Sequence, residues 1–174
     1  MENTPKAVIE SLLQSQQSFF TTHETKSIDF RIRNLKKFKS AILRYERKIA
    51  DALWTDLHKS YEEAYMTEIA LVIGEINNHL KHIKRWSASR RIKTPLALQP
   101  SGCRIVYEPL GVSLIMAPWN YPFQLLMNPL VGAISSGCCA ILKPSPYTPT
   151  VALVMEEMIS ETFDSKYIAV AQGN

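Results

Sequence analysis

The stretch that decides the fold reads EPLGVSLIMAPWNYPF at residues 108–123 and continues as PLVGAISSGCCAILKPS at residues 129–145. Two compact apolar runs, at 112–116 and 139–143, have the length of buried strands, and the residues between them have the length of a helix. Gly137 supplies the left-handed residue that ends this helix. Pro129 is expected to kink or restart it, because proline lacks an amide hydrogen and clashes with the preceding turn. The stretch therefore predicts a βαβ unit.

The same pattern continues toward the C-terminus. Thr148 followed by Pro149 is an N-cap and first-turn signal for a helix that runs to about residue 163. A short apolar run at 167–170 then predicts a third strand. The order β-α-β-α-β implies parallel strands joined by right-handed crossovers. We therefore predict a partial Rossmann-like domain over residues 111–174.

The preceding residues have helical spacing and almost no glycine or proline before about residue 90. Thr4 and Pro5 predict the start of a first helix, Ser27 the cap of a second, and residues 61–86 a third. We predict that residues 1–94 form one helical segment.

Turn residues (Pro95, Pro100, Ser101 and Gly102) lie at the start of and within the segment 96–109 and predict two short strands and a turn there. Residues 95–110 are thus expected to form a strand pair with an oligomerisation or bridging role. The predicted fold class is α/β: a helical segment followed by the first part of a parallel sheet.

Composition narrows the class of protein. An apolar share of 46% and a charged share of 21% are typical of a globular protein, and no apolar run is long enough to span a membrane. The first ten residues, MENTPKAVIE, lack the pattern of a secretion signal. Three cysteines without a ligand spacing predict free thiols and no metal site. We expect a cytoplasmic protein.

The net charge of +4 is unevenly distributed. Residues 1–100 hold 17 of the 20 Lys and Arg residues, and several of these lie between Lys81 and Lys93. Such a run is found in nucleic-acid binders. It is also typical of a solvated helix end, where basic side chains complement the helix dipole. We favour the second interpretation and expect no nucleic-acid partner.

Two proline-rich loops follow the first two predicted strands, at 117–122 and 143–146. Ligands bind beyond the carboxyl ends of strands in open parallel sheets. If the strands are adjacent, the Asn120 amide and the Lys143 ammonium can serve one small-molecule site. The loops can equally be rigid connections without a ligand. The glycine-rich GxGxxG turn is missing after the first strand, so a dinucleotide would have to bind in another way.

In the order and spacing of PWNYP, the glycine-terminated helix and LKPS, the sequence resembles the aldehyde dehydrogenase family, and within it the class 3 branch. The helical run KSYEEAYMTEI at residues 59–69 also resembles that branch. The resemblance covers essentially the whole chain, yet it represents less than half of a family member. It implies oxidation of aldehydes to carboxylic acids with NAD or NADP, and a homodimer in the intact enzyme.

The resemblance also implies residue roles. Asn120 would be the oxyanion-hole side chain, and Tyr121 would border the aldehyde pocket. The residues expected to contact the cofactor are Met116, Ala117, Pro118, Trp119, Lys143 and Ser145. Many relatives have a glutamate that contacts the ribose at the position of Pro146, and its absence favours NADP.

The resemblance further implies that the general-base glutamate and the nucleophilic cysteine lie beyond residue 174. Cys138 and Cys139 begin an apolar strand at the end opposite Lys143, which predicts packing roles. The chain alone is then expected to be inactive. The alternative is a truncated, non-catalytic protein that binds nucleotide weakly or associates with full-length subunits.

Overall fold

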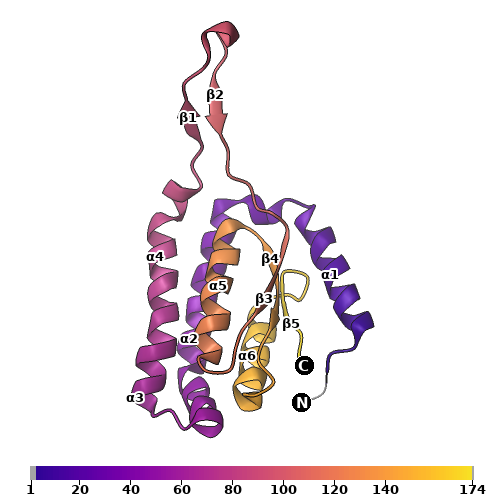
Figure 1. Ribbon diagram of the computed structural model, residues 1–174, viewed down its shortest axis with the longest axis vertical. Coiled ribbons are helices and arrows are strands. Elements are labelled where there is room, and N and C mark those ends of the chain that lie inside the picture. The colour runs from indigo at the N-terminus through magenta and orange to yellow at the C-terminus, as the bar shows by residue number, and fades with distance from the viewer. Residues whose placement is uncertain (1–2, 174) are drawn as a thin grey trace.

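A computed structural model describes residues 3–173 and has an α/β fold (Figure 1). A parallel sheet of order β3-β4-β5 lies at its centre, formed by β3 (Val112–Met116), β4 (Cys139–Lys143) and β5 (Ile168–Val170). Two helices, α5 (Pro122–Ser136) and α6 (Pro149–Thr162), connect the strands. The predicted β-α-β-α-β order is confirmed.

The remaining helices cover this unit from both sides. The helix α1 (Lys6–Phe20) lies against β3 and β4, on the side opposite α5 (Figure 1). A second layer of helices, α2 (Ile28–Leu57) and α4 (Ala70–Trp86), packs over α5, and α2 also covers α6. The helical segment and the sheet therefore share one hydrophobic core, which includes Phe38, Ile76, Phe123 and Leu142.

The connections between these helices are short. The one-turn η1 (Glu24–Lys26) joins α1 to α2, and Ser27 caps α2 by accepting the Phe30 amide hydrogen, as predicted. The short α3 (Tyr61–Ala64) and the π-helical turn η2 (Tyr65–Ile69) precede α4. The helix predicted over 61–86 is therefore interrupted by a π turn.

A thin hairpin extends away from the body of the molecule (Figure 1). It consists of β1 (Arg90–Ile92) and β2 (Cys103–Ile105), paired antiparallel, with the single turn η3 (Leu96–Leu98) at its tip. The turn residues predicted both strands after residue 95, which is wrong for the first one. The charged residues Arg90 and Arg91 carry no strand pattern, because all of β1 is exposed. The oligomerisation role of this hairpin stays a prediction.

Three details of the helix ends differ from expectation. Thr4 does not cap α1; its hydroxyl accepts the Gln172 amide hydrogen at 2.8 Å and ties the N-terminal segment to the residues after β5. Pro129 does not restart α5, which continues past its exposed ring to Ser136, and the expected kink stays a prediction. Thr148 occupies the N-cap position of α6, but its side chain makes no capping hydrogen bond.

The predicted end of α5 is confirmed. Gly137 adopts a left-handed conformation with φ of 87°, and the Gly137 and Cys138 amides donate to the carbonyl oxygen of Ala133. This turn directs the chain into β4. The outermost residues Met1, Glu2 and Asn174, where the predicted end segments begin and end, lie outside the described residues.

Candidate functional site

The two proline-rich loops leave neighbouring strands at the same edge of the sheet. β3 and β4 are parallel and in register, so that Met116 pairs with Lys143 at their carboxyl ends. One further hydrogen bond, from the Ala117 amide to the Lys143 carbonyl oxygen at 3.2 Å, holds the start of the first loop against the second. The predicted adjacency of the two strands is confirmed.

Most of the candidate residues on the first loop face outward. Met116, Trp119 and Tyr121 are 66%, 54% and 39% exposed, and Pro118 and Asn120 are exposed as well. Ala117 is half-buried. Since β3 alternates, Ile115 points into the core while Leu114 and Met116 point out. The loop therefore presents a strip of apolar side chains that ends at the Asn120 amide.

The second loop offers a different surface. Lys143 is half-buried at the last position of β4. Ser145 is buried, and its hydroxyl accepts the Tyr147 amide hydrogen at 3.3 Å, so its observed contact lies within its own loop. The predicted contact of Ser145 with a cofactor stays a prediction.

An ammonium beside an exposed apolar strip fits the chemistry of a dinucleotide. The hydroxyls of a ribose can accept hydrogen bonds from Lys143, and the apolar side chains of the first loop can contact a base. Pro122 and Phe123 begin α5 directly after this loop. The residues present are thus compatible with NAD or NADP bound beyond the strand ends.

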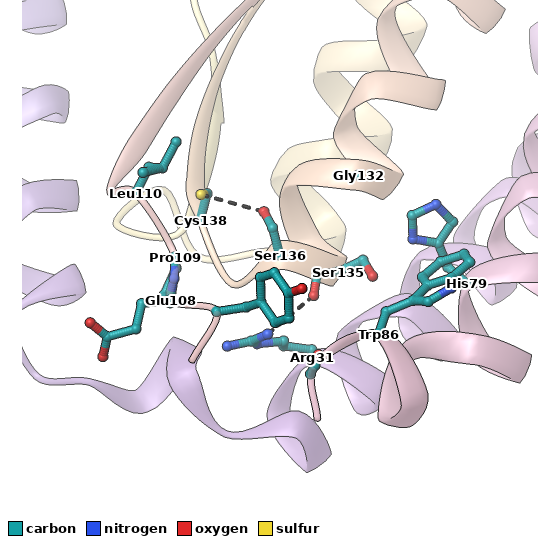
Figure 2. Close-up of a pocket in the computed structure, with 12 residues that line it drawn as sticks. Arg31, His79, Trp86, Glu108, Pro109, Leu110, Gly132, Ser135, Ser136 and Cys138 are labelled. Atoms are coloured by element: carbon teal, nitrogen blue, oxygen red, sulfur yellow. Dashed lines mark hydrogen bonds between the residues drawn. The ribbon is translucent and has the colours of Figure 1, made fainter. Parts of the chain in front are cut away.

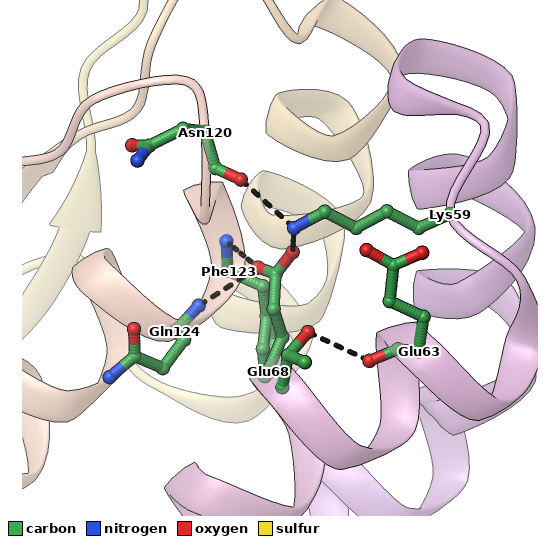
Figure 3. Close-up of polar contacts among 7 residues, drawn as sticks. Lys59, Glu63, Glu68, Asn120, Phe123 and Gln124 are labelled. Carbon is green, nitrogen blue, oxygen red and sulfur yellow. Dashed lines mark hydrogen bonds and ion pairs between the residues drawn. The ribbon is translucent and has the colours of Figure 1, made fainter.

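Beneath the first loop lies a pair of charged residues for which the sequence analysis predicted no role: Lys59, which follows α2, and Glu68, in η2. The ammonium of Lys59 also donates to the Asn120 carbonyl oxygen at 2.9 Å (Figure 3). Both residues lie in the run KSYEEAYMTEI at 59–69, but no local pattern in that run pairs them. The π turn changes the helical spacing there, so the contact could not be read from periodicity.

A separate cavity of about 400 Å³ lies at the C-terminal end of α5, near the start of β3 (Figure 2). Its lining includes Arg31, Trp86, Tyr107 and Cys138. None of the predicted site residues lines it. The cavity and the loops at the strand ends are therefore different sites.

The two adjacent cysteines differ in the pKa of their thiols, and of the two only Cys138 lines this cavity. Cys139 is fully buried, and burial raises the pKa of its thiol to about 12, which agrees with the predicted packing role. Burial also opposes ionisation of Cys138, but hydrogen bonds from the Ser136 hydroxyl and the Gly111 and Leu110 backbone outweigh it and lower the pKa of the Cys138 thiol.

Within residues 3–173, the structure contains no cluster of three or more His, Cys, Asp or Glu side chains arranged to hold a metal. Across the same residues, every helix is too short or too polar to cross a membrane.

Comparison with known proteins identifies the class of protein that this architecture represents. The model of the aldehyde dehydrogenase family matches residues 1–174. Among curated relatives, 4,4'-diaponeurosporen-aldehyde dehydrogenase of Staphylococcus aureus is 47% identical over 166 residues, which cover 95% of this chain and 36% of that protein. The dimeric NADP-preferring aldehyde dehydrogenase of Canis lupus familiaris is 33% identical over 95% of this chain and 36% of its own length.

Solved structures of aldehyde dehydrogenases share the fold of this chain. The substrate-bound state of Staphylococcus aureus AldH superposes with a TM-score of 0.93 at 47% identity, over 95% of this chain and 36% of that one. An aldehyde dehydrogenase of Brucella melitensis biovar abortus has a TM-score of 0.87 at 20% identity, over 100% of this chain and 35% of its own, which shows the shared fold. The chain belongs to the aldehyde dehydrogenase family, with class 3 members among its relatives. It spans about a third of the length of the curated relatives that it matches.

Proposed function

We propose that the full-length protein carrying this sequence oxidises aldehydes to carboxylic acids with NAD or NADP. The observation that supports this most directly is the placement of Asn120 and Lys143 on adjacent loops at the carboxyl ends of β3 and β4, in a chain that matches the family model throughout. Sequence beyond residue 174 would supply the nucleophilic cysteine and the general base.

Asn120 would act on the oxygen of the aldehyde. When a cysteine thiolate adds to the carbonyl carbon, negative charge develops on that oxygen, and the Asn120 amide hydrogens would stabilise it. The exposed side chain of Asn120 is free to make this contact. Tyr121, the next residue, would border the aldehyde.

The cofactor would lie along Met116, Ala117, Pro118 and Trp119, with Lys143 donating to ribose hydroxyls and Ser145 nearby. When bound, it would accept the hydride from the thiohemiacetal carbon. The proline at position 146 leaves that side of the ribose without a carboxylate, which favours NADP. The name of the canine relative, dimeric and NADP-preferring, supports the same choice and a homodimer. We place the protein in the cytoplasm because it has three free thiols.

The test is to supply the full-length protein with hexanal or benzaldehyde and with NAD or NADP. Reduction of the cofactor is monitored through the absorbance of its reduced form. Asn120→Ala should lower kcat by about two to three orders of magnitude, since one oxyanion donor is lost. Asn78→Ala, on the exposed side of α4, is the matched control and should have wild-type kcat. Wild-type protein that reduces neither cofactor would refute the proposal.

A further inference from the structure

The buried pair of Lys59 and Glu68 connects three separate segments of the chain. The Lys59 Nζ lies 2.6 Å from one carboxylate oxygen of Glu68, and the other carboxylate oxygen accepts the Phe123 amide hydrogen at 2.9 Å and the Gln124 amide hydrogen at 3.2 Å. The side chains are 9% and 0% exposed, respectively. Figure 3 shows this network at the start of α5.

Every charge in this network has partners. Both Glu68 oxygens are hydrogen-bonded, and the Lys59 ammonium donates to Glu68 and to the Asn120 carbonyl oxygen. The ammonium also lies 3.9 Å from the centroid of the Tyr121 ring, within range of a cation–π interaction. A buried ion pair commonly costs as much in desolvation as it gains in attraction. Stability alone therefore does not explain this pair, whereas fixing a conformation does.

The segment that the pair fixes is the one that carries Asn120. Lys59 holds the carbonyl oxygen of Asn120, and Glu68 holds the amides three and four residues later. The segment from Asn120 to Gln124, which joins the loop to the first turn of α5, is thus held at both ends by one ion pair. The side chain of Asn120 points away from Lys59 and makes no contact with the pair (Figure 3).

The π turn η2 positions Glu68 at the start of α5. Glu68 is the fourth residue of this five-residue turn, which widens the helix just where α5 begins. π turns of this kind occur frequently at functional sites. The carboxylate also accepts amide hydrogens at the positive end of the α5 dipole. Phe123 is fully buried, so its amide depends on Glu68 instead of solvent.

We propose that Lys59 and Glu68 are positioning residues that set the orientation of the Asn120 side chain during aldehyde oxidation. This inference rests on the proposed function, because it gives Asn120 its role. The pair touches neither substrate nor cofactor in this proposal and acts through the loop, by its hydrogen bonds to the backbone and by the contact of Lys59 with the Tyr121 ring.

The decisive variant is Lys59→Met combined with Glu68→Gln in the full-length protein. The glutamine oxygen can still accept the Phe123 and Gln124 amides, so the cap of α5 is kept, and no charge is left unpaired. The hydrogen bond to the Asn120 carbonyl is lost. Since small misplacements of a catalytic group are costly, we expect kcat to fall about 10- to 100-fold while KM for NAD(P) stays within about twofold.

The matched control is Lys48→Met combined with Glu157→Gln. This pair joins α2 to α6, with Lys48 Nζ 2.7 Å from a Glu157 oxygen, and both side chains are about half exposed. It makes the same change of charge away from the loop. We expect wild-type kcat from this control.

Adding Asn120→Ala to the Lys59/Glu68 variant distinguishes a positioning role of the pair from a purely structural one. If the pair acts through Asn120, the double substitution should change kcat by less than about twofold in the Asn120→Ala background, because residues that act as one unit are not additive. A fall in kcat that is the same with and without Asn120 overturns the inference, as does wild-type kcat of the Lys59/Glu68 variant. If that variant does not fold, Lys59→Met alone carries the test with the same expected outcomes, because it removes the hydrogen bond to the Asn120 carbonyl and leaves Glu68 on the Phe123 and Gln124 amides. Failure of Asn120→Ala itself to lower kcat would refute the role proposed for Asn120, and a wild type without activity would refute the proposed function.

Discussion

The Asp56 carboxylate, near the end of α2, accepts the Val151 amide hydrogen in the first turn of α6 at 2.9 Å. This is the hydrogen bond that Thr148 was expected to provide from within its own helix. A helix N-terminus leaves its first amides without intrahelical partners, and an acceptor from another element serves as well as a local one. The start of α6 is therefore fixed by tertiary structure.

Asp56→Ala should lower the stability of the protein by about 1 kcal/mol, the usual cost of losing an N-cap acceptor. Thermal unfolding of the full-length protein measures this as a lower Tm. Asp56→Asn is the control, because its side-chain oxygen keeps the acceptor, and it should lose much less. Equal Tm values for Asp56→Ala and wild type would show that the Val151 amide finds another partner.

Thr148→Val should leave stability unchanged or raise it. The Thr148 hydroxyl is buried, and no hydrogen-bond partner is found for it among residues 3–173. Burying a hydroxyl without a partner costs about 1 to 3 kcal/mol, and valine has nearly the same shape without that group. A Tm below that of wild type would mean that the hydroxyl does make a stabilising contact.

The sequence predicted the elements whose pattern is local. The bounds of β3 and β4 match the predicted runs 112–116 and 139–143. Gly137 ends α5 in the left-handed conformation that glycine readily adopts. It also placed Asn120 and Lys143 at neighbouring strand ends. Each of these follows from apolar spacing, a turn residue or the parallel topology.

What the sequence did not reveal depends on partners distant along the chain. Glu68 and Phe123 are 55 positions apart, and Asp56 and Val151 are 95 apart, so no local pattern relates them. The exposed strand β1 has no buried face, and hence no alternation to detect. The helical backbone of the front segment was predictable, whereas the contacts that join it to the candidate site required the three-dimensional structure.

Gly137→Ala should be strongly destabilising. A Cβ at this position would lie 2.7 Å from the Thr25 carbonyl oxygen and 2.7 Å from Arg31 Nε, and the φ of 87° is itself unfavourable for alanine. The left-handed backbone alone costs about 1 to 2 kcal/mol, and the clash with the Thr25 backbone adds to it. We expect a clear decrease of Tm.

Gly74→Ala is the control for this prediction. Gly74 lies within α4 with no atom within 4 Å of an added Cβ. Alanine is favoured over glycine in a helix interior by about 1 kcal/mol, so this variant should have a higher Tm than wild type. If both variants changed Tm in the same direction, the close approach of Arg31 and Thr25 to Gly137 would be wrong.

The two adjacent cysteines should differ in their reactivity toward an alkylating reagent. Thiolates, and not thiols, are alkylated. The pKa of Cys138 is lowered, since the hydrogen bonds from Ser136 and the backbone outweigh burial, whereas burial raises that of Cys139 to about 12. Cys138 also lines the cavity of Figure 2, into which a small reagent can diffuse. Iodoacetamide should therefore modify Cys138 in the folded full-length protein and leave Cys139 unmodified, as measured by peptide mass spectrometry.

The pH dependence of the alkylation rate reports the direction in which the pKa of Cys138 is shifted. A lowered pKa means that the Cys138 thiolate forms at lower pH than an ordinary thiol, so its alkylation rate should level off at lower pH. Ser136→Ala removes the hydroxyl that lies 3.4 Å from the Cys138 sulfur and should move the profile to higher pH. Preferential labelling of Cys139, or a Ser136→Ala profile that does not move, would contradict the hydrogen-bonded thiol described for this cavity.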